Sequence, residues 1–238
     1  MCYETALTKN GKQIQEFFQK ELAIPLEFEP YYHLSGFSHP NLQIVKMDEP
    51  EKIYPANWGF VPTWGTKDIP AFYKKYNTLN TKSETLFNGL SKESALNKRC
   101  LIIADGFFEP HQKAGVSLPY FCHIPSSKFD DGRDLFMFGG IYSEIEKDSN
   151  LFSVSILTME ANSFFSEIHN VKKRQPFVID EELYDEWFNP NLKEENVLEL
   201  IKHGFTSKEF SAYPVSRDLY KRSIDTNNPE ILKAVVTD

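Results

Sequence analysis

The sequence predicts an α+β fold built mostly from antiparallel strands. Short apolar runs of strand length recur along the chain, and the helical segments between them do not alternate with the strands as βαβ units would. No internal repeat and no Gly-, Ser- or Pro-rich linker divides the 238 residues, so a single domain is expected. The content of 41% hydrophobic and 14% aromatic residues is typical of a globular protein.

Strands are predicted wherever a compact apolar run is bounded by turn residues. In one run, Phe152, Val154 and Ile156 alternate with serines, as in a strand with one buried face. Another run ends at Asp105-Gly106, a pair that is typical of turns. The predicted strands span residues 42–46, 100–104, 119–124, 135–138, 151–157 and 176–179.

Helices are predicted near both ends of the chain. Apolar residues from Ile14 to Leu22 recur at helical spacing, which predicts an amphipathic helix over residues 9–22. The other expected helices are short ones that Ser83 or Ser91 could cap, one over 181–188, and one over 194–203 that Gly204 ends.

The chain is acidic overall, but its basic residues are clustered. The net charge of −8 argues against a general nucleic-acid binder, which usually carries a basic surface. The basic residues are nevertheless clustered, which fits either a local cationic groove or ordinary solvated faces. The clusters are Lys74-Lys75, Lys98-Arg99, Lys172-Lys173-Arg174, and Arg217 with Lys221-Arg222.

The cysteines and the apolar runs bear on the compartment. Cys2, Cys100 and Cys122 form no CxxC pair, which favours a reducing cytoplasm, and the last two lie in apolar runs where we expect them to be buried. No run of about 18 apolar residues predicts a membrane span, and residues 1–10 lack the core of a signal peptide.

Cys2 is the most informative single residue. After removal of Met1, it would carry a free α-amine and a thiol on neighbouring carbons. Together these two groups can attack an aldehyde and close a five-membered thiazolidine ring. A second-position cysteine alone is weak support for a site, so other polar residues must complete it.

Three polar residues that interrupt apolar stretches are candidates for this role. Asn80, Glu109 and His169 are expected in loops or at helix ends, where functional groups commonly lie. Each also has an ordinary interpretation, as a turn-bracing amide, a surface carboxylate and a helix-end imidazole. No HExxH, GxGxxG, P-loop or GxSxG pattern is present, so neither a metal site nor a cofactor is expected.

Six segments, taken in order, resemble the SRAP (SOS response-associated peptidase) family. The ordered set spans about residues 2–217 and leaves 218–238 as a C-terminal tail. The resemblance implies a single SRAP domain over residues 1–238, with a barrel-like core and peripheral helices. The segments are Met1-Cys2, Trp58-Gly-Phe-Val-Pro-Thr-Trp64, Asn80-Thr-Lys-Ser-Glu-Thr85, Arg99-Cys-Leu-Ile-Ile-Ala-Asp-Gly-Phe-Phe-Glu109, Ile168-His169 with Arg174-Gln-Pro176, and Tyr213-Pro-Val-Ser216.

The resemblance implies a covalent sensor of abasic sites in single-stranded DNA, which shields the lesion during the DNA damage response. Cys2 would form a thiazolidine crosslink to the ring-opened sugar, with lyase-type chemistry. Its α-amine has an ordinary pKa of about 7.7–8.0, so a useful fraction is neutral at pH 7. His169 is suited to protonate the sugar ring oxygen because the pKa of imidazole lies near neutrality. The implied catalytic residues are Cys2, Asn80, Glu109 and His169, and the implied DNA contacts are Trp64, Lys82 and Arg174.

The chain departs from the family in two places. The family often begins Met-Cys-Gly-Arg, whereas Tyr3 and Glu4 follow Cys2 here, so one phosphate contact is in doubt. The family's His-x-Arg-x-Pro spacing is lengthened between His169 and Pro176, and the added lysines compensate electrostatically. We therefore predict DNA binding that weakens steeply with salt.

Two other functions stay open at this point. One is a thiol (auto)peptidase that uses Cys2 and His169. The other is a non-covalent single-stranded DNA-binding module that stacks bases on Trp58 and Trp64. For the crosslinking function, the expected partner is single-stranded DNA with abasic sites. The protein is expected to be a cytoplasmic monomer without membrane contact, associated with the nucleoid when bound to DNA.

Overall fold

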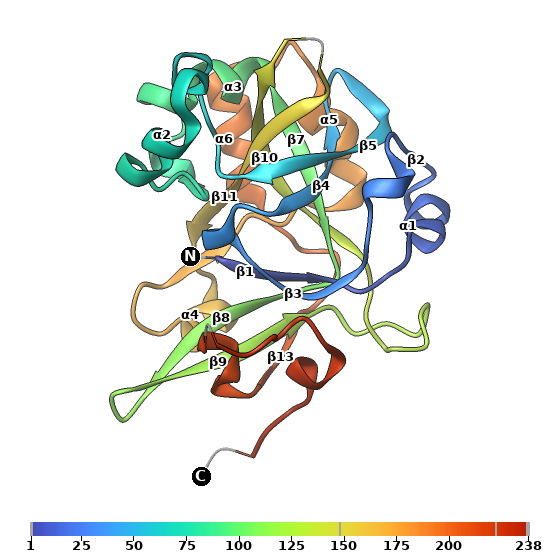
Figure 1. The fold of residues 1–238 in the computed structure, drawn as a ribbon, viewed down its shortest axis with the longest axis vertical. Coiled ribbons are helices and arrows are strands. Elements are labelled where there is room, and N and C mark those ends of the chain that lie inside the picture. Colours follow the sequence, from blue (N-terminus) through green and yellow to red (C-terminus); the bar gives the residue numbers. More distant parts are fainter. Residues whose placement is uncertain (1, 148, 222, 237–238) are drawn as a thin grey trace.

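The computed structural model describes residues 2–147, 149–221 and 223–236, so Met1 and Arg222 lie outside the described residues. Their strands form two sheets with mostly antiparallel pairing, which confirms the predicted α+β class (Figure 1). The strands are β1 (Glu4–Leu7), β2 (Glu21–Leu22), β3 (Tyr31–Ser35), β4 (Asn41–Lys46), β5 (Glu49–Trp58), β6 (Asn80–Lys82), β7 (Arg99–Ala104), β8 (Gly106–Lys113), β9 (Val116–His123), β10 (Phe136–Glu146), β11 (Leu151–Glu160), β12 (Arg174–Pro176) and β13 (Ser211–Pro214).

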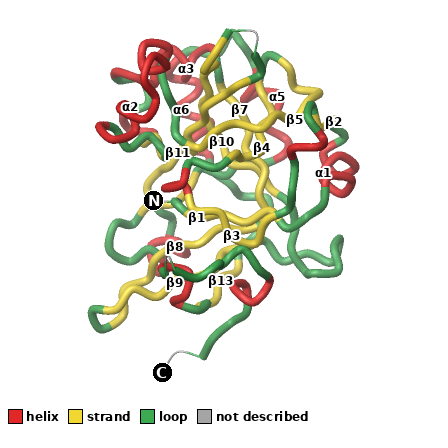
Figure 2. Tube along the Cα trace, viewed as in Figure 1, coloured by secondary structure: helices red, strands yellow, loops and turns green. Residues whose placement is uncertain are grey.

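The helices are short and lie around the outside of the sheets (Figure 2). Among the described residues, none is long and apolar enough to cross a membrane. The α-helices are α1 (Gly11–Phe18), α2 (Ile69–Lys75), α3 (Lys92–Asn97), α4 (Ser163–Ile168), α5 (Tyr184–Phe188) and α6 (Glu194–His203). Short 3-10 turns occupy Pro25–Glu27, Gly36–Ser38, Thr63–Asp68, Ser83–Thr85, Gly89–Ser91, Glu181–Leu183, Arg217–Tyr220 and Pro229–Leu232.

The larger sheet bends into a ring, which confirms the barrel-like core. Its strand order is β12-β11-β10-β7-β4-β5-β2, and a short parallel pairing of β5 with β11 brings the sheet back on itself. The main hydrophobic core is formed by side chains of this sheet, of α5 and α6, and of part of the smaller sheet. Tyr142, Phe138 and Trp187 are among its largest fully buried side chains.

The smaller sheet lies below the ring in Figure 1 and has the order β13-β9-β8-β1-β3. The chain passes from the large sheet to the small one at Asp105-Gly106, between β7 and β8. The predicted turn at this pair is therefore a joint between sheets. A Cβ atom on Gly106 would lie 2.2 Å from the ring of Phe121, so only glycine fits there.

Most predicted elements occur, although several limits differ: β10 extends the strand predicted over 135–138, and the α-helix predicted over 181–188 begins at Tyr184 after a 3-10 turn. Two further differences have a clear cause. The helix predicted over 9–22 ends at Phe18, because Gln19 turns into the left-handed region (φ 53°) and Leu22 pairs with β5 instead. The strand predicted over 176–179 is formed by Arg174–Pro176, and Val178 makes only an isolated bridge to Phe138. Pairing across the sheets, which local sequence patterns do not encode, sets both limits.

Candidate functional site

Strand pairing brings Cys2 close to Glu109. β1 runs antiparallel to β8 with Glu4 opposite Phe108, so the same register continued by one residue places Tyr3 beside Glu109. The Cys2 side chain is fully buried, with Sγ 3.8 Å from the carbonyl oxygen of Glu4. Burial, and then the nearby Glu109 carboxylate, raise the pKa of the Cys2 thiol well above its usual value.

Glu109 lies within a strand and not in a loop. The sequence predicts that it follows a strand and a turn, but the apolar run continues as β8, and Glu109 is opposite Tyr120 of β9. It is therefore a buried carboxylate, which rules out the alternative of a surface position. Strand pairing with β9 therefore fixes the backbone that carries this carboxylate.

His169 reaches Glu109 from the end of α4. Asn162 caps the start of this helix, accepting a hydrogen bond from the Phe165 amide, and His169 follows its last turn. The Nδ1 atom of His169 lies 3.2 Å from Oε2 of Glu109 and 3.1 Å from the carbonyl oxygen of Arg174. The two side chains are only 4% and 0% exposed, so their contact is shielded from water.

Burial acts on the two groups in opposite directions. It raises the pKa of Glu109 to about 7 and lowers the pKa of His169 to about 4. In both cases a charge in a dry site is disfavoured. The expectation that the pKa of His169 lies near neutrality is therefore wrong, and Glu109 is the group of this pair that titrates close to pH 7.

A clamp on β8 holds the loop that carries His169. The side-chain amide of Asn170 accepts from the Gln112 amide (2.9 Å) and donates to the Gln112 carbonyl (2.8 Å), as a neighbouring strand would. The Nδ1 atom of His111 lies 3.1 Å from the carbonyl oxygens of Glu167 and of Ile168. One strand therefore carries Glu109 and also positions His169.

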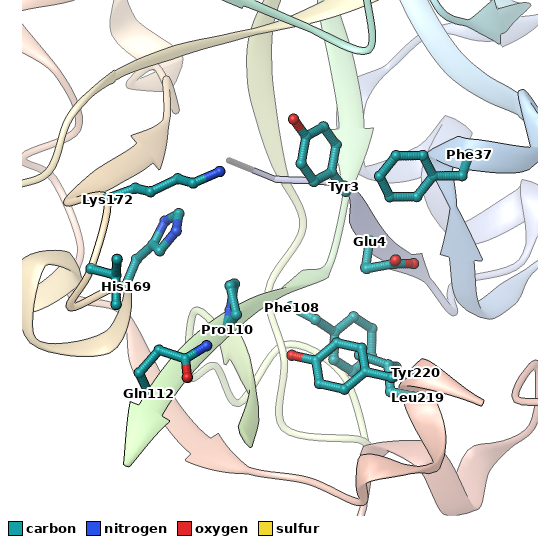
Figure 3. A pocket seen from close by; sticks show the side chains of 11 residues that line it. Tyr3, Glu4, Phe37, Phe108, Pro110, Gln112, His169, Lys172, Leu219 and Tyr220 are labelled. Atoms are coloured by element: carbon teal, nitrogen blue, oxygen red, sulfur yellow. The ribbon is translucent and has the colours of Figure 1, made fainter. Parts of the chain in front are cut away.

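A cavity of about 640 Å³ opens at this site (Figure 3). His169 and Tyr3 form part of its wall, while Cys2 and Glu109 are buried next to these lining residues. The cavity is large enough for a sugar and part of a nucleotide. Its lining residues are Tyr3, Glu4, Phe37, Phe108, Pro110, Gln112, His169, Val171, Lys172, Leu219 and Tyr220.

Asn80 is the fourth predicted partner and is placed differently. It begins β6, where it lies opposite Ile156 of β11. Both polar atoms of its amide are buried, and neither has a hydrogen-bond partner within the described residues. Contacts thus connect Cys2, Glu109 and His169, whereas Asn80 carries an unsatisfied amide that a ligand would satisfy.

The three predicted DNA contacts have different surroundings. Trp64 is 55% exposed and makes T-shaped contacts with Phe72 and Tyr76. Lys82 is exposed in β6. Arg174 already pairs with Glu84 and donates to the carbonyl oxygen of Thr158 (2.8 Å), so a phosphate would have to compete for it.

Trp58 does not have the surroundings of a base-stacking residue. Its side chain is fully buried, and its indole Nε1 donates to the carbonyl oxygen of Leu79 at 2.9 Å. The suggestion that Trp58 stacks on bases is therefore wrong, and its alternative interpretation as a core residue is correct.

Sequence reasoning missed two aromatic residues of the cavity wall and named Lys172 only as part of a basic cluster. Phe37 and Tyr220 are 57% and 42% exposed, and Lys172 extends into the opening in Figure 3. The available signal was an aromatic residue within a polar turn, as in Gly36-Phe37-Ser38. Within the described residues, no three His, Cys, Asp or Glu side chains are grouped as metal ligands would be.

The family model described as SOS response associated peptidase (SRAP) matches residues 1–222. The chain belongs to the SRAP family. This SRAP chain is 27% identical to the abasic site processing protein YoqW of Bacillus subtilis, over 98% of this chain and 100% of that protein. It is 29% identical to the abasic site processing protein HMCES of Rattus norvegicus, over 76% of this chain and 56% of that longer protein.

The SRAP fold also occurs in solved structures. A protein from Bacteroides thetaiotaomicron superimposes with a TM-score of 0.83 at 23% identity, covering 99% of this chain and all of the other. A protein from Bordetella bronchiseptica superimposes with a TM-score of 0.72 at 19% identity, over 90% of this chain and all of the other. At these identities the likeness concerns the fold alone.

Proposed function

We propose that this protein processes abasic sites in DNA by forming a covalent crosslink through Cys2 to the lesion in single-stranded DNA. The observation that carries the proposal is the buried contact of Glu109 with His169 beside Cys2, at the edge of an open cavity. The substrate class is supported by relatives that are named abasic site processing proteins.

The reaction needs the α-amine of Cys2. After removal of Met1, which lies outside the described residues, the neutral amine attacks the aldehyde carbon of the ring-opened sugar and water leaves, giving an imine. The Cys2 thiol then adds across the C=N bond: sulfur bonds to carbon, and the thiol proton moves to nitrogen. One water is lost overall, and the intramolecular second step gains from proximity.

Glu109 and His169 supply the proton transfers. With a pKa of about 7, Glu109 is present in both protonation states at neutral pH, as a general acid–base group should be. The carbonyl oxygen of Arg174 can only accept a hydrogen bond, so Nδ1 of neutral His169 carries the ring proton. Nε2 takes the proton of the C1 hydroxyl as the sugar ring opens and returns it to the ring oxygen. The carboxylate form of Glu109 accepts a proton from the attacking amine and gives it to the hydroxyl that leaves as water.

Asn80 is suited to hold a polar group of the bound reactants. Its buried amide offers two donors and one acceptor oxygen that no described residue uses. We assign it to orient the Cys2 amine or the sugar hydroxyl. Leaving these groups unsatisfied costs free energy in the unbound protein, and binding recovers it.

Peptide cleavage by Cys2 is less well supported. A cysteine peptidase needs a thiolate, and reactive cysteines have a lowered thiol pKa. Burial raises the pKa of the Cys2 thiol instead. A thiol that adds as a neutral group to an imine is compatible with this environment.

Crosslinking can be tested with protein whose Met1 removal is verified by intact mass. The wild type should give a denaturation-resistant band with single-stranded DNA that carries one abasic site, and none with a tetrahydrofuran analogue that lacks the aldehyde. Cys2→Ala keeps the α-amine but loses the thiol, so it should give a covalent band only after borohydride reduction of the imine. Cys100→Ala, which removes a buried thiol elsewhere, should crosslink like the wild type.

The proton relay is tested by His169→Gln, with His203→Gln at the end of α6 as the control. We expect the crosslinking rate to fall about 100-fold in His169→Gln alone. A stable, unreduced crosslink from Cys2→Ala, or no crosslink from processed wild type, would show the proposed function to be wrong.

A further inference from the structure

A second cavity, of about 600 Å³, adjoins the first. The two cavities share four lining residues, Glu4, Phe37, Leu219 and Tyr220. Glu4 therefore lies where they meet, with His169 in the wall of the first cavity and Thr226 in the wall of the second. We refer to the two adjoining cavities together as the groove.

The carboxylate of Glu4 is held in a fixed orientation. Its Oε2 atom lies 2.6 Å from Nε2 of His33, and its Oε1 atom accepts a hydrogen bond from the Ser35 hydroxyl at 3.2 Å. The other ring nitrogen of His33 lies 2.6 Å from the Thr226 hydroxyl, which fixes the imidazole. Among the described residues, no lysine or arginine forms an ion pair with Glu4.

This arrangement leaves Glu4 able to accept further hydrogen bonds. Each carboxylate oxygen can accept two hydrogen bonds, and each has one protein partner here. The side chain is 16% exposed, and the exposed part faces the groove. The groove therefore presents a rigid hydrogen-bond acceptor with a partly desolvated negative charge.

Aromatic rings flank this acceptor. Figure 3 shows Phe37 on one side of Glu4 and Tyr220 on the other. Phe37 also packs against Tyr3, with ring centroids 4.9 Å apart. Exposed rings beside a groove are typical platforms for unpaired nucleobases, because every base has a π-face that can stack.

We propose that this junction is a subsite for the nucleobase next to the abasic site, and that Glu4 selects bases with an exocyclic amino group. The proposal rests on the proposed function for the substrate class. A carboxylate only accepts hydrogen bonds, so it favours the amino groups of guanine, adenine and cytosine. Thymine offers a single N–H between two carbonyl oxygens, which the carboxylate repels.

The test uses the Cys2→Ala protein and non-covalent binding, so that the covalent step plays no part. Fluorescence anisotropy measures its affinity for single-stranded DNA with a tetrahydrofuran abasic analogue, in which one flanking base at a time is varied. At one of the two flanking positions, thymine should bind about fivefold to tenfold more weakly than guanine. Adding Glu4→Gln should remove most of this difference, because an amide both donates and accepts.

Two further variants separate base selection from general effects. Phe37→Ala should weaken binding of all four flanking bases by a similar factor, because stacking is tolerant of sequence. Glu51→Gln removes the same charge from an exposed position of β5 and should leave the order of the bases unchanged.

Two results would overturn the subsite. One is equal affinity for all four bases at both flanking positions. The other is a Glu4→Gln variant that binds all four more tightly by the same factor, since Glu4 would then only repel phosphate. A failure of crosslinking would overturn the proposed function and leave this binding measurement intact.

Discussion

Glu109 is the residue on which the proposed chemistry depends most. The Glu109 side chain has no exposed surface, so ionising its carboxyl group in the folded protein costs free energy. The same penalty brings the pKa of Glu109 to about 7, where proton transfer at neutral pH is efficient. Strongly shifted groups beside a cavity are common at functional sites.

The cost of ionising the buried Glu109 makes the free energy of unfolding depend on pH. The folded-state pKa of Glu109 is raised from 4.5 to about 7, so its contribution to stability is fully present below pH 4.5 and is lost as the pH rises through 7. Between pH 5 and 8, the free energy of unfolding of the wild type should fall by about 2 kcal/mol relative to Glu109→Gln. Chemical denaturation of both proteins at the two pH values measures this difference.

Glu199→Gln is the matched control, because Glu199 is exposed on α6 and should show no such difference. The lowered pKa of His169 acts in the opposite sense: its contribution is lost as the pH falls from 6.5 through about 4. His169 is present in both proteins, so the comparison reports mainly on Glu109. If the free energy of unfolding depends on pH in the same way in the wild type and in Glu109→Gln, Glu109 is already ionised at pH 5 in the folded protein.

At the scale of elements, strand β8 organises the site. It carries Glu109, pairs with β1 next to Cys2, and clamps the loop after α4 through Asn170. The sequence predicts a lengthened spacing in this loop, and the loop is folded back by a hydrogen bond from the Lys173 amide to the His169 carbonyl at 2.9 Å. The extra residues therefore form a local turn and do not separate His169 from Glu109.

Asn170→Ala should weaken the position of His169 without touching the reacting groups. Two hydrogen bonds are lost, so we expect a fall of about 1 kcal/mol in the free energy of unfolding. The crosslinking rate should fall several-fold while non-covalent affinity for DNA stays the same, because the clamp acts on geometry. Asn191→Ala, at an exposed turn, is the control. A rate equal to that of the wild type would limit Asn170 to a role in stability.

For the whole molecule, the acidic net charge does not describe the surface at the cavity. The chain carries −8, yet Lys172 lies at the opening and Lys82 is exposed on β6. Association with a polyanion then depends on a few local cations and is sensitive to screening.

Affinity for single-stranded DNA should therefore fall steeply as the salt concentration rises. In Lys172→Gln, the slope of log affinity against log salt should decrease by about one, because one phosphate contact is lost. Lys147→Gln, at the exposed β10–β11 turn, should leave the slope unchanged. Binding that does not change with salt would contradict an electrostatic groove.

Local sequence patterns were sufficient for much of the fold. The alternation of Phe152, Val154 and Ile156 predicted β11, and the apolar run from Cys100 to Ala104 predicted β7. They failed where partners distant in sequence decide the structure. Glu109 was expected outside a strand, because nothing local shows that β8 is paired on both sides, by β1 and by β9.

The sequence by itself determined the α+β class. It also determined that Cys2 would carry a thiol next to an α-amine once Met1 is removed. Both depend only on residue types and their order. It also named Glu109 and His169 as candidates. Only the tertiary structure decided that these two side chains meet at 3.2 Å in a dry site, and that their pKa values move in opposite directions. The reason is physical: burial and proximity are created by contacts between strands and helices that are far apart along the chain.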